Sequence, residues 1–563
     1  MYLDDLKNNL AVLLGVSPLD FVYPPQPEMG DICLPLFNLA KSRGQNLAAC
    51  AQELVSDLSK KETLADFFQS IKAVGPYLNF FFHSGALASG LIRDVEEFGQ
   101  SFGRVDVGGG KKIMLEYSNV NTHKEYHVGH LRNLFYGDAV ARIMNFNGYQ
   151  IIPVSYINDF GIHTAKTLWN WQKHPEYANS VEPRGQLLGE CYSAAVKNIG
   201  EDELAKKEVT AVMQAIESRR GEIYQLWQET RSWSIAYFDD IYKHFGIKFD
   251  HIFYESEVID EGLKIVEQFL TSGIFKKSQG AIIADLEAYS LGILPIIRSD
   301  GTALYPVADL ALARHKFKKY DLQESVYVID VRQGLYFQQL AKIFELAGDN
   351  FKITHLGYDF VTLKNGMMSS RSGNIITYNQ IWAEAFSRAE KEVSSRHEDW
   401  SKEKIDQVAK NLAIAALKFE MVKVSADKVI TFSVDEALRF EGFTAAYLQY
   451  TGARLASILR KAEIDTSMIA DFSLLTHPKE SALVLYLARF PEAVAKAGEQ
   501  RDPSAVARYL FELAQTFNDY YHEVNILKAE APLAIARLGF LKSARQVLFN
   551  GFELLGFTYL EEM

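Results

Sequence analysis

The stretches KKIMLEYS (residues 111–118) and QIIPVSYI (residues 150–157) decide the fold, because each has the apolar pattern of a buried β-strand. Between them, EYHVGHLRN (residues 125–133) opens a segment with apolar residues on one face of a helix, and Gly148 ends that helix. This order predicts a βαβ unit over residues 112–157, with a right-handed crossover and a parallel sheet. The two histidines then lie just beyond the carboxyl end of a strand, where open α/β sheets bind ligands.

Length and composition indicate a folded chain of several domains. The chain has 563 residues, of which 48% are hydrophobic and 23% charged. It contains no apolar run of about eighteen residues, and its acidic start, MYLDDLKNN, is unlike a secretory signal. We therefore expect a cytoplasmic protein with no membrane segment. The net charge of −12 does not favour nucleic acid in bulk, although local basic patches on an acidic body can still hold an RNA.

The cysteines argue against two kinds of site. Cys33, Cys50 and Cys191 are widely spaced and odd in number. This pattern is not that of a disulfide framework or of a cysteine-built zinc site, and buried small hydrophobic residues account for it.

The patterning predicts a multidomain α/β protein with a Rossmann-type parallel sheet. Helical periodicity followed by the strand-like VGPYLNFFF predicts an α+β N-terminal domain, and the glycine run at residues 108–110 marks its end. A helical insertion interrupts the sheet pattern, which resumes at residues 293–317, 326–331 and 353–361. The remainder is helical in period and predicts an all-α C-terminal bundle. The expected domains are 1–105, 106–378 with the insertion at about 165–290, a helical connection 379–435, and 436–563.

The pair His127 and His130 has three interpretations. A zinc site needs a third ligand; His123, Glu125 and His163 are available, but no cysteine lies near them. Two ordinary exposed histidines at a helix start are the second interpretation. The third is a phosphate cradle, in which helix amides and imidazoles bind an anion and Gly129 leaves room for it. A second phosphate element would support the third interpretation.

The stretch KNGMMSSRSGNIITY (residues 364–378) is a candidate for that element. It follows the last predicted strand, and it combines small polar residues with two glycines and Arg371. A mobile loop of this composition can close over a triphosphate, although a solvated turn has the same composition.

Taken together, these motifs resemble the class I aminoacyl-tRNA synthetases. HVGH resembles their HIGH motif and MMSSRSGN their KMSKS loop, in the same order. LEYSNVNTHKEYHVGHLRN is similar to the arginyl-tRNA synthetase pattern ExSSPNxxKPxHxGHLR. The resemblance continues in GDICLPLFNLAK, GPYLNFFF, DGTALYPVADLALA, VIDVRQGLYFQQL, LQYTGARLASILRKA and the ending LLGFTYLEEM, so it covers nearly the whole chain.

The resemblance implies a function. Members of this family activate arginine with ATP to arginyl-adenylate and transfer it to the terminal adenosine of tRNA(Arg). It implies ATP with Mg²⁺ as substrate, no zinc, tRNA(Arg) and arginine as partners, an anticodon-binding C-terminal bundle, and a monomer.

The resemblance also assigns residues, some to two roles. The implied catalytic residues are Lys124, His127, His130 and Arg371. The implied ATP-binding residues are His127, Gly129, His130, Met368, Ser369 and Ser370. The implied arginine-binding residues are Glu116, Asn119, Asn121, Glu255, Tyr305, Asp309 and Gln333.

One departure from the family pattern concerns charge. Met367 and Ser370 stand where the KMSKS loop has its lysines, so the loop lacks its usual cations. A pentacovalent phosphate needs cationic help, and Lys124 is the expected substitute, with Arg371 as a second charge.

Two alternatives to an arginyl enzyme are a different class I synthetase and a non-catalytic relative. A cysteinyl enzyme needs a zinc-thiolate pocket, and a glutamyl enzyme a cationic pocket, whereas Glu255, Tyr305 and Asp309 make an acidic one. A non-catalytic relative would lose the HxGH motif or the pocket acids, and both are present.

Overall fold

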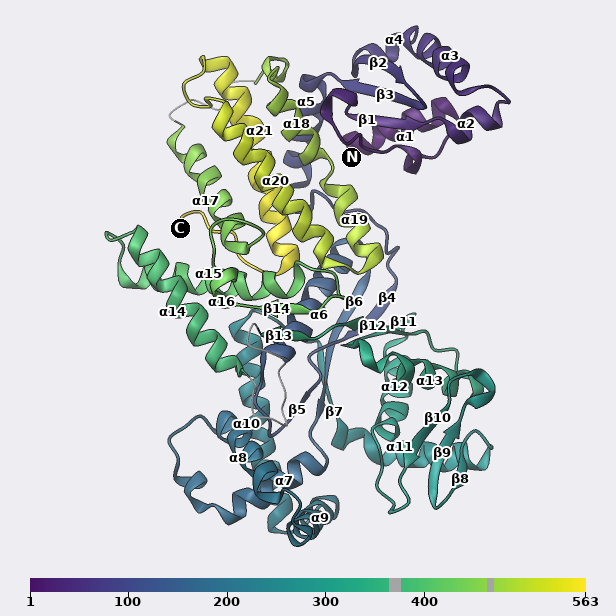
Figure 1. Ribbon diagram of the computed structural model, residues 1–563, viewed down its shortest axis with the longest axis vertical. Helices are drawn as coiled ribbons and strands as arrows, with labels where there is room; N and C mark the ends of the chain where they lie inside the picture. Colours follow the sequence, from purple (N-terminus) through teal and green to yellow (C-terminus); the bar gives the residue numbers. More distant parts are fainter. Residues whose placement is uncertain (364–375, 463–469) are drawn as a thin grey trace. The chain divides into compact units, whose positions relative to one another are not determined.

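The computed structural model describes residues 1–363, 376–462 and 470–563. They form two compact units, each assembled from segments distant in sequence (Figure 1). The α/β unit consists of residues 106–439 and 501–504. The helical unit consists of residues 1–105, 440–500 and 505–563. Within the described ranges, no helix combines the length and hydropathy needed to cross a bilayer.

A parallel sheet of six strands forms the centre of the α/β unit. Its order is β12-β11-β4-β6-β5, and β7 also pairs with β6. The strands are β4 (Lys112–Glu116), β5 (Val120–Asn121), β6 (Gln150–Asn158), β7 (His251–Tyr254), β11 (Glu324–Asp330) and β12 (Ile353–Tyr358). Met114, Val154 and Val328 are fully buried, as expected of strands covered on both faces. The predicted βαβ unit is confirmed, with α6 (Val128–Phe146) between β4 and β6.

Three helices share a core with this sheet: α11 (Glu255–Thr271), α12 (Pro306–Tyr320) and α13 (Gly334–Leu346). The prediction that residues 293–297 continue the parallel sheet is wrong. This strand, β10 (Ile293–Ile297), belongs to a separate antiparallel sheet with β9 (Ala281–Asp285) and β8 (Lys276–Ser278). The chain after it forms α12, because Pro306 starts a helix whose apolar residues recur with helical period.

Four helices lie between β6 and β7 in sequence: α7 (Ile162–Lys173), α8 (Arg184–Ile199), α9 (Glu203–Glu217) and α10 (Glu222–His244). They bury a small core of their own, which includes Leu168, Trp169, Val209, Ile216 and Trp227. The chain then returns to the main sheet at β7. Figure 1 shows these helices beside the carboxyl ends of β5 and β7.

The α/β unit ends in helices and a two-stranded parallel pair. The helices are α14 (Tyr378–Arg396), α15 (Lys402–Val422) and α16 (Val434–Ala437). The paired strands are β13 (Val361–Leu363) and β14 (Ile430–Phe432).

The helical unit joins the two ends of the chain. Its N-terminal part is an antiparallel sheet in the order β1-β3-β2 with helices: α1 (Tyr2–Leu14), β1 (Ile32–Pro35), α2 (Phe37–Ser42), α3 (Leu47–Ser59), α4 (Glu62–Ala65), β2 (Phe68–Val74), β3 (Tyr77–Phe82) and α5 (Ser84–Phe98). Its C-terminal part is helical: α17 (Ala445–Lys461), α18 (Pro478–Ala488), α19 (Phe490–Gln500), α20 (Pro503–Glu523) and α21 (Ala531–Leu555). The predicted α+β N-terminal part and all-α C-terminal part are both confirmed.

Candidate active site

The two histidines of the HxGH motif form a stacked pair at the start of α6. His127 is the N-cap residue, and its backbone N–H donates to Nδ1 of His130 at 3.3 Å. The ring centroids lie 3.7 Å apart. A Cβ atom on Gly129 would meet the His127 ring at 3.1 Å, so a side chain at this position would require the ring to shift. Burial lowers the pKa of His127 to about 4, an effect that Lys124 strengthens, and burial lowers the pKa of His130 well below its usual value.

Both imidazoles are therefore neutral near pH 7 and act as hydrogen-bonding groups rather than as cations. Because Nδ1 of His130 accepts a hydrogen bond, its proton is assigned to Nε2, which is left to donate. Nδ1 of His127 is buried and has no protein partner among the described residues. These nitrogens can contact a bound ligand.

Lys124 brings a positive charge to these histidines. Its Nζ lies 5.0 Å from the centre of the Tyr192 ring of α8, and no described carboxylate forms an ion pair with it. Burial and the nearby Lys166 lower its pKa. The charge of Lys124 also depresses the pKa values of His127 and His130. An anion at the start of α6 would give this ammonium its missing partner.

The chain that follows the serine-rich loop returns to the same place. The Tyr378 N–H donates to the Tyr126 carbonyl at 2.7 Å, and the Val128 N–H donates to the Ile376 carbonyl at 3.3 Å. An isolated antiparallel bridge joins His127 to Thr377. The end of the loop is thus attached to the HxGH segment. The predicted loop residues Met368, Ser369, Ser370 and Arg371 lie outside the described residues.

The strand-end residues Glu116 and Asn119 are already paired within the protein. Glu116, at the end of β4, forms a buried ion pair with Lys316 of α12. The Asn119 amide donates to the other Glu116 oxygen at 2.9 Å. Asn121 lies on β5 beside Asn158 of β6. Sequence patterns did not single out Lys316, whose position in an apolar helix face was the available clue.

The acidic residues Glu255 and Asp309 lie close enough to influence each other. Glu255 opens α11, and Asp309 lies in the first turn of α12, where it accepts a hydrogen bond from the Tyr336 hydroxyl. Burial, with the charges of Asp159 and Asp309, raises the pKa of Glu255 to about 8. Burial raises the pKa of Asp309 to about 7, although the Tyr336 hydroxyl lowers it. Neither carboxylate forms an ion pair with a described lysine, arginine or histidine, so a ligand cation would relieve their mutual repulsion.

Aromatic residues lie beside these two acids. Tyr305, half-exposed at the start of α12, packs edge-on against Tyr336 with ring centroids 4.7 Å apart. Tyr156 on β6 is buried, and burial together with the charges of Glu255 and Asp309 raises its pKa well above the ordinary value. Sequence reasoning missed Tyr156 and Tyr336, although Tyr336 lies in the quoted segment VIDVRQGLYFQQL.

Gln333 has a different environment from the other predicted arginine-binding residues. It ends the short 3₁₀ helix Val331–Gln333, just after β11, and is exposed. The Gln333 side chain forms no hydrogen bond with any described residue. Gln333 is therefore available to a ligand, but contacts within the protein do not fix its orientation.

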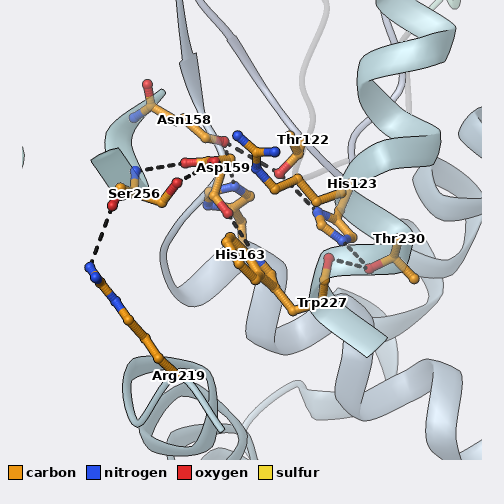
Figure 2. Close-up of polar contacts among 10 residues, drawn as sticks. Thr122, His123, Asn158, Asp159, His163, Arg219, Trp227, Thr230 and Ser256 are labelled. Carbon is orange, nitrogen blue, oxygen red and sulfur yellow. Dashed lines mark hydrogen bonds and ion pairs between the residues drawn. The ribbon is translucent and has the colours of Figure 1, made fainter. Parts of the chain in front are cut away.

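Asp159 is a further buried acid that sequence reasoning missed. This residue, labelled in Figure 2, follows β6 and is fully buried. It forms an ion pair with Arg231 of α10 at 2.5 Å. Its carboxylate also accepts hydrogen bonds from Ser256, the residue after Glu255. The available clue was its place directly after a predicted strand.

Comparison with known proteins gives matches along most of the chain. Three family models match: "tRNA synthetases class I (R), catalytic domain" at residues 98–432, "DALR anticodon binding domain" at residues 448–563, and "Arginyl tRNA synthetase N terminal domain" at residues 4–82. The arginine–tRNA ligase of Bdellovibrio bacteriovorus is 34% identical over 552 residues, which cover 96% of this chain and 94% of that protein. The Treponema pallidum ligase is 33% identical with the same coverage. The solved Thermus thermophilus arginyl-tRNA synthetase has a TM-score of 0.80 at 28% identity, covering 100% of this chain and 99% of its own.

Proposed function

The chain belongs to the class I arginyl-tRNA synthetase family, and from this premise we propose how its residues carry out that family's reaction. The enzyme is an arginine–tRNA ligase. It activates L-arginine with ATP to give arginyl-adenylate and pyrophosphate, and it then transfers arginine to the 3′-terminal adenosine of tRNA(Arg). Our proposal concerns the residues that perform these steps.

The observation that carries the proposal is a pattern of unpaired charge. Among the described residues of the site, the Lys124 ammonium forms no ion pair with a carboxylate. The Glu255 and Asp309 carboxylates form no ion pair with a cation, although the charge of Lys316 lowers the pKa of Asp309. Two substrates bound side by side, one carrying an anion and the other a cation, would supply the missing partner to Lys124 and to the two carboxylates. ATP brings the anion and the arginine guanidinium brings the cation.

Glu255 and Asp309 bind the guanidinium in this proposal. A guanidinium presents five N–H donors in a planar fork and keeps its charge at all physiological pH values. Two desolvated carboxylates can accept several of those donors at once, and Tyr305 covers one side. Because both acids are partly withdrawn from water, a neutral or anionic side chain would leave them unpaired and is rejected.

The polar groups at the strand ends bind the other end of arginine. Asn121 and Gln333 contact the α-amino and carboxylate groups. Asn119 completes this set, and Glu116 positions it by accepting its amide hydrogen bond at 2.9 Å. Lys316 already neutralises Glu116, so Glu116 contributes position rather than a free negative charge.

The HxGH segment and Lys124 bind the phosphates of ATP. An arginine carboxylate oxygen attacks the α-phosphorus in line, a P–O bond forms, and pyrophosphate leaves. His127 and His130 donate hydrogen bonds to the phosphate oxygens, Gly129 leaves space for the nucleotide, and the helix start adds its partial positive charge. Mg²⁺ enters with the triphosphate as part of the substrate.

Lys124 supplies the charge that the serine-rich loop lacks. Negative charge builds up on the phosphate oxygens during the attack, and a nearby ammonium stabilises it. Met368, Ser369, Ser370 and Arg371 contribute from the loop in this proposal. Support for this arrangement comes from Ile376 and Tyr378, which attach the end of the loop to the HxGH segment.

The remaining parts of the proposal concern organisation. The domains are 1–105 for tRNA binding, 106–378 for catalysis with an insertion at about 165–290, 379–435 as a connection, and 436–563 for the anticodon. The enzyme works as a cytoplasmic monomer. The division into domains is supported at its two ends by the matches to an N-terminal domain at residues 4–82 and to an anticodon-binding domain at residues 448–563.

Pyrophosphate exchange with each amino acid tests the proposal. The assay is run with and without tRNA(Arg), using the wild type and the variants Lys124→Ala and Glu255→Gln. We expect arginine to be the one amino acid that supports exchange. Lys124→Ala should exchange more slowly, and Glu255→Gln should have a raised KM for arginine. Exchange driven by another amino acid would refute the specificity, and unchanged constants in the two variants would refute the residue roles.

A further inference from the structure

One face of α10 contacts His123, which precedes Lys124, and Asp159, which binds the residue after Glu255. Trp227, Thr230, Arg231 and Ser234 are spaced i, i+3, i+4 and i+7, so they lie on a single face of the helix. Trp227, Thr230 and Ser234 are buried. None of these four residues belongs to a recognised motif, yet all of them hydrogen-bond to the chain that leaves β5 or β6.

The first of these contacts fixes the residue before Lys124. The His123 N–H donates to Oγ of Ser234 at 2.9 Å. Nε2 of His123 lies 2.8 Å from Oγ1 of Thr230, as Figure 2 shows. His123 is fully buried, and its φ of 61° is in the left-handed region, which is uncommon for a residue with a side chain. The backbone around Lys124 therefore depends on contacts that hold His123 in this conformation.

The hydrogen bonds assign the protons of this group. The Thr230 hydroxyl donates to the Leu226 carbonyl at 2.8 Å, so it accepts from Nε2–H of His123. Nδ1 then accepts from the Thr122 hydroxyl at 2.9 Å. Burial lowers the pKa of His123 to about 3, so the ring stays neutral and these bonds persist at neutral pH. His123 is thus a fixed support and not a base.

The second set of contacts fixes the start of α11. Arg231 pairs with Asp159 at 2.5 Å, and the Trp227 indole N–H donates to the Asp159 carbonyl at 2.8 Å. The Asp159 carboxylate accepts from the Ser256 N–H at 2.9 Å and from the Ser256 hydroxyl at 2.7 Å (Figure 2). Because Glu255 immediately precedes Ser256, Asp159 determines where the Glu255 side chain begins.

We propose that this face of α10 is the positioning element of the active site. Thr230 and Ser234 place Lys124 through His123, and Trp227 and Arg231 place Glu255 through Asp159. The proposal rests on the proposed roles of Lys124 and Glu255. It predicts that variants at the Lys124 end lower the activation rate and leave arginine binding unchanged. Variants at the Glu255 end should weaken arginine binding and leave the rate unchanged, whereas a general loss of structure would impair both the rate and the binding.

Variants at each end test the separation by pyrophosphate exchange with tRNA(Arg) present. Loss of one hydrogen bond to the His123 group in Ser234→Ala or Thr230→Val should lower the exchange rate constant about tenfold, with the arginine KM changed less than about twofold. Ser232→Ala is the matched control and should behave as wild type, because Ser232 is exposed and its hydroxyl donates only to the Glu229 backbone carbonyl of the same helix.

At the other end, Asp159→Asn and Ser256→Ala should raise the arginine KM about tenfold, with the rate constant and the ATP KM changed less than about twofold. Glu261→Gln, at an exposed position of α11, is the matched control. Thermal unfolding of each variant distinguishes a folded enzyme with altered constants from a misfolded one. If Asp159→Asn does not fold, Ser256→Ala alone tests the Glu255 end.

Two results would overturn the inference. One is that both sets of variants alter the same constants to the same degree, and the other is that folded variants at both ends behave as wild type. Lys124→Ala and Glu255→Gln are measured in parallel. If these two also leave the constants unchanged, the proposed function of the residues fails as well; if they change them, the failure is confined to α10.

Discussion

Arginine affinity should fall steeply as the pH is lowered from 8 to 6. A carboxylate accepts guanidinium hydrogen bonds in its ionised form, so a proton on Glu255 or Asp309 competes with arginine. Burial and neighbouring acids raise the pKa of Glu255 to about 8 and burial raises that of Asp309 to about 7. In the complex, the bound cation holds both groups ionised. Binding therefore releases protons, and affinity rises with pH until both acids are ionised in the free enzyme.

The magnitude follows from the competition between protons and arginine. A group with a pKa of about 7 weakens the apparent Kd about tenfold between pH 8 and pH 6. A group with a pKa of about 8 adds a factor of up to about fifty over the same interval. The guanidinium of arginine keeps its charge throughout. Asp309 alone therefore sets a minimum of about tenfold.

Isothermal titration calorimetry of arginine binding at pH 6, 7 and 8 measures the effect. Two buffers of different ionisation enthalpy at each pH reveal proton release directly. Asp309→Asn is the control: it should bind arginine weakly, with a shallower pH dependence. Equal Kd values at pH 6 and pH 8, together with enthalpies that do not depend on the buffer, would refute the reasoning. Thermal unfolding at each pH confirms that the free enzyme remains folded.

Three further predictions concern other parts of the site. Lys124→Ala should slow arginine activation about a hundredfold while changing the ATP Kd less than about threefold, and a normal activation rate by pyrophosphate exchange would exclude the compensating role. Gly129→Ala should slow activation about tenfold with unchanged thermal unfolding, since the new Cβ meets the His127 ring at 3.1 Å; a wild-type rate would show that the ring can move freely. Lys316→Met should destabilise the fold by about 3–5 kcal/mol in urea unfolding, because it leaves the Glu116 charge buried, and a loss below about 1 kcal/mol would contradict this.

Sequence patterns predicted the parts of the fold that local periodicity controls. The βαβ unit of β4, α6 and β6 followed from apolar strands and a helix with a glycine stop. The assignment of β10 to the main sheet failed because five apolar residues carry no information about which strand they pair with. Pairing partners depend on contacts between distant segments, which periodicity does not encode.

The same limit applies to the site. That Lys124, His127 and His130 lie close together could be predicted because they belong to one short motif. Lys316 and Asp159 could not, because each acts through a partner far along the chain: Lys316 neutralises Glu116, and Asp159 joins α10 to α11. Buried ion pairs of this kind become visible only once the fold brings their members together.

Discrimination between arginine and citrulline tests the central claim most directly. Citrulline has nearly the shape of arginine but carries a neutral ureido group, so it lacks the charge that Glu255 and Asp309 require. We predict that the wild type activates arginine and rejects citrulline, and that Asp309→Asn narrows the ratio of their kcat/KM values by about 10–100-fold. A wild type that activates both equally, or an Asp309→Asn variant with undiminished discrimination, would contradict selection of the guanidinium by two unpaired carboxylates.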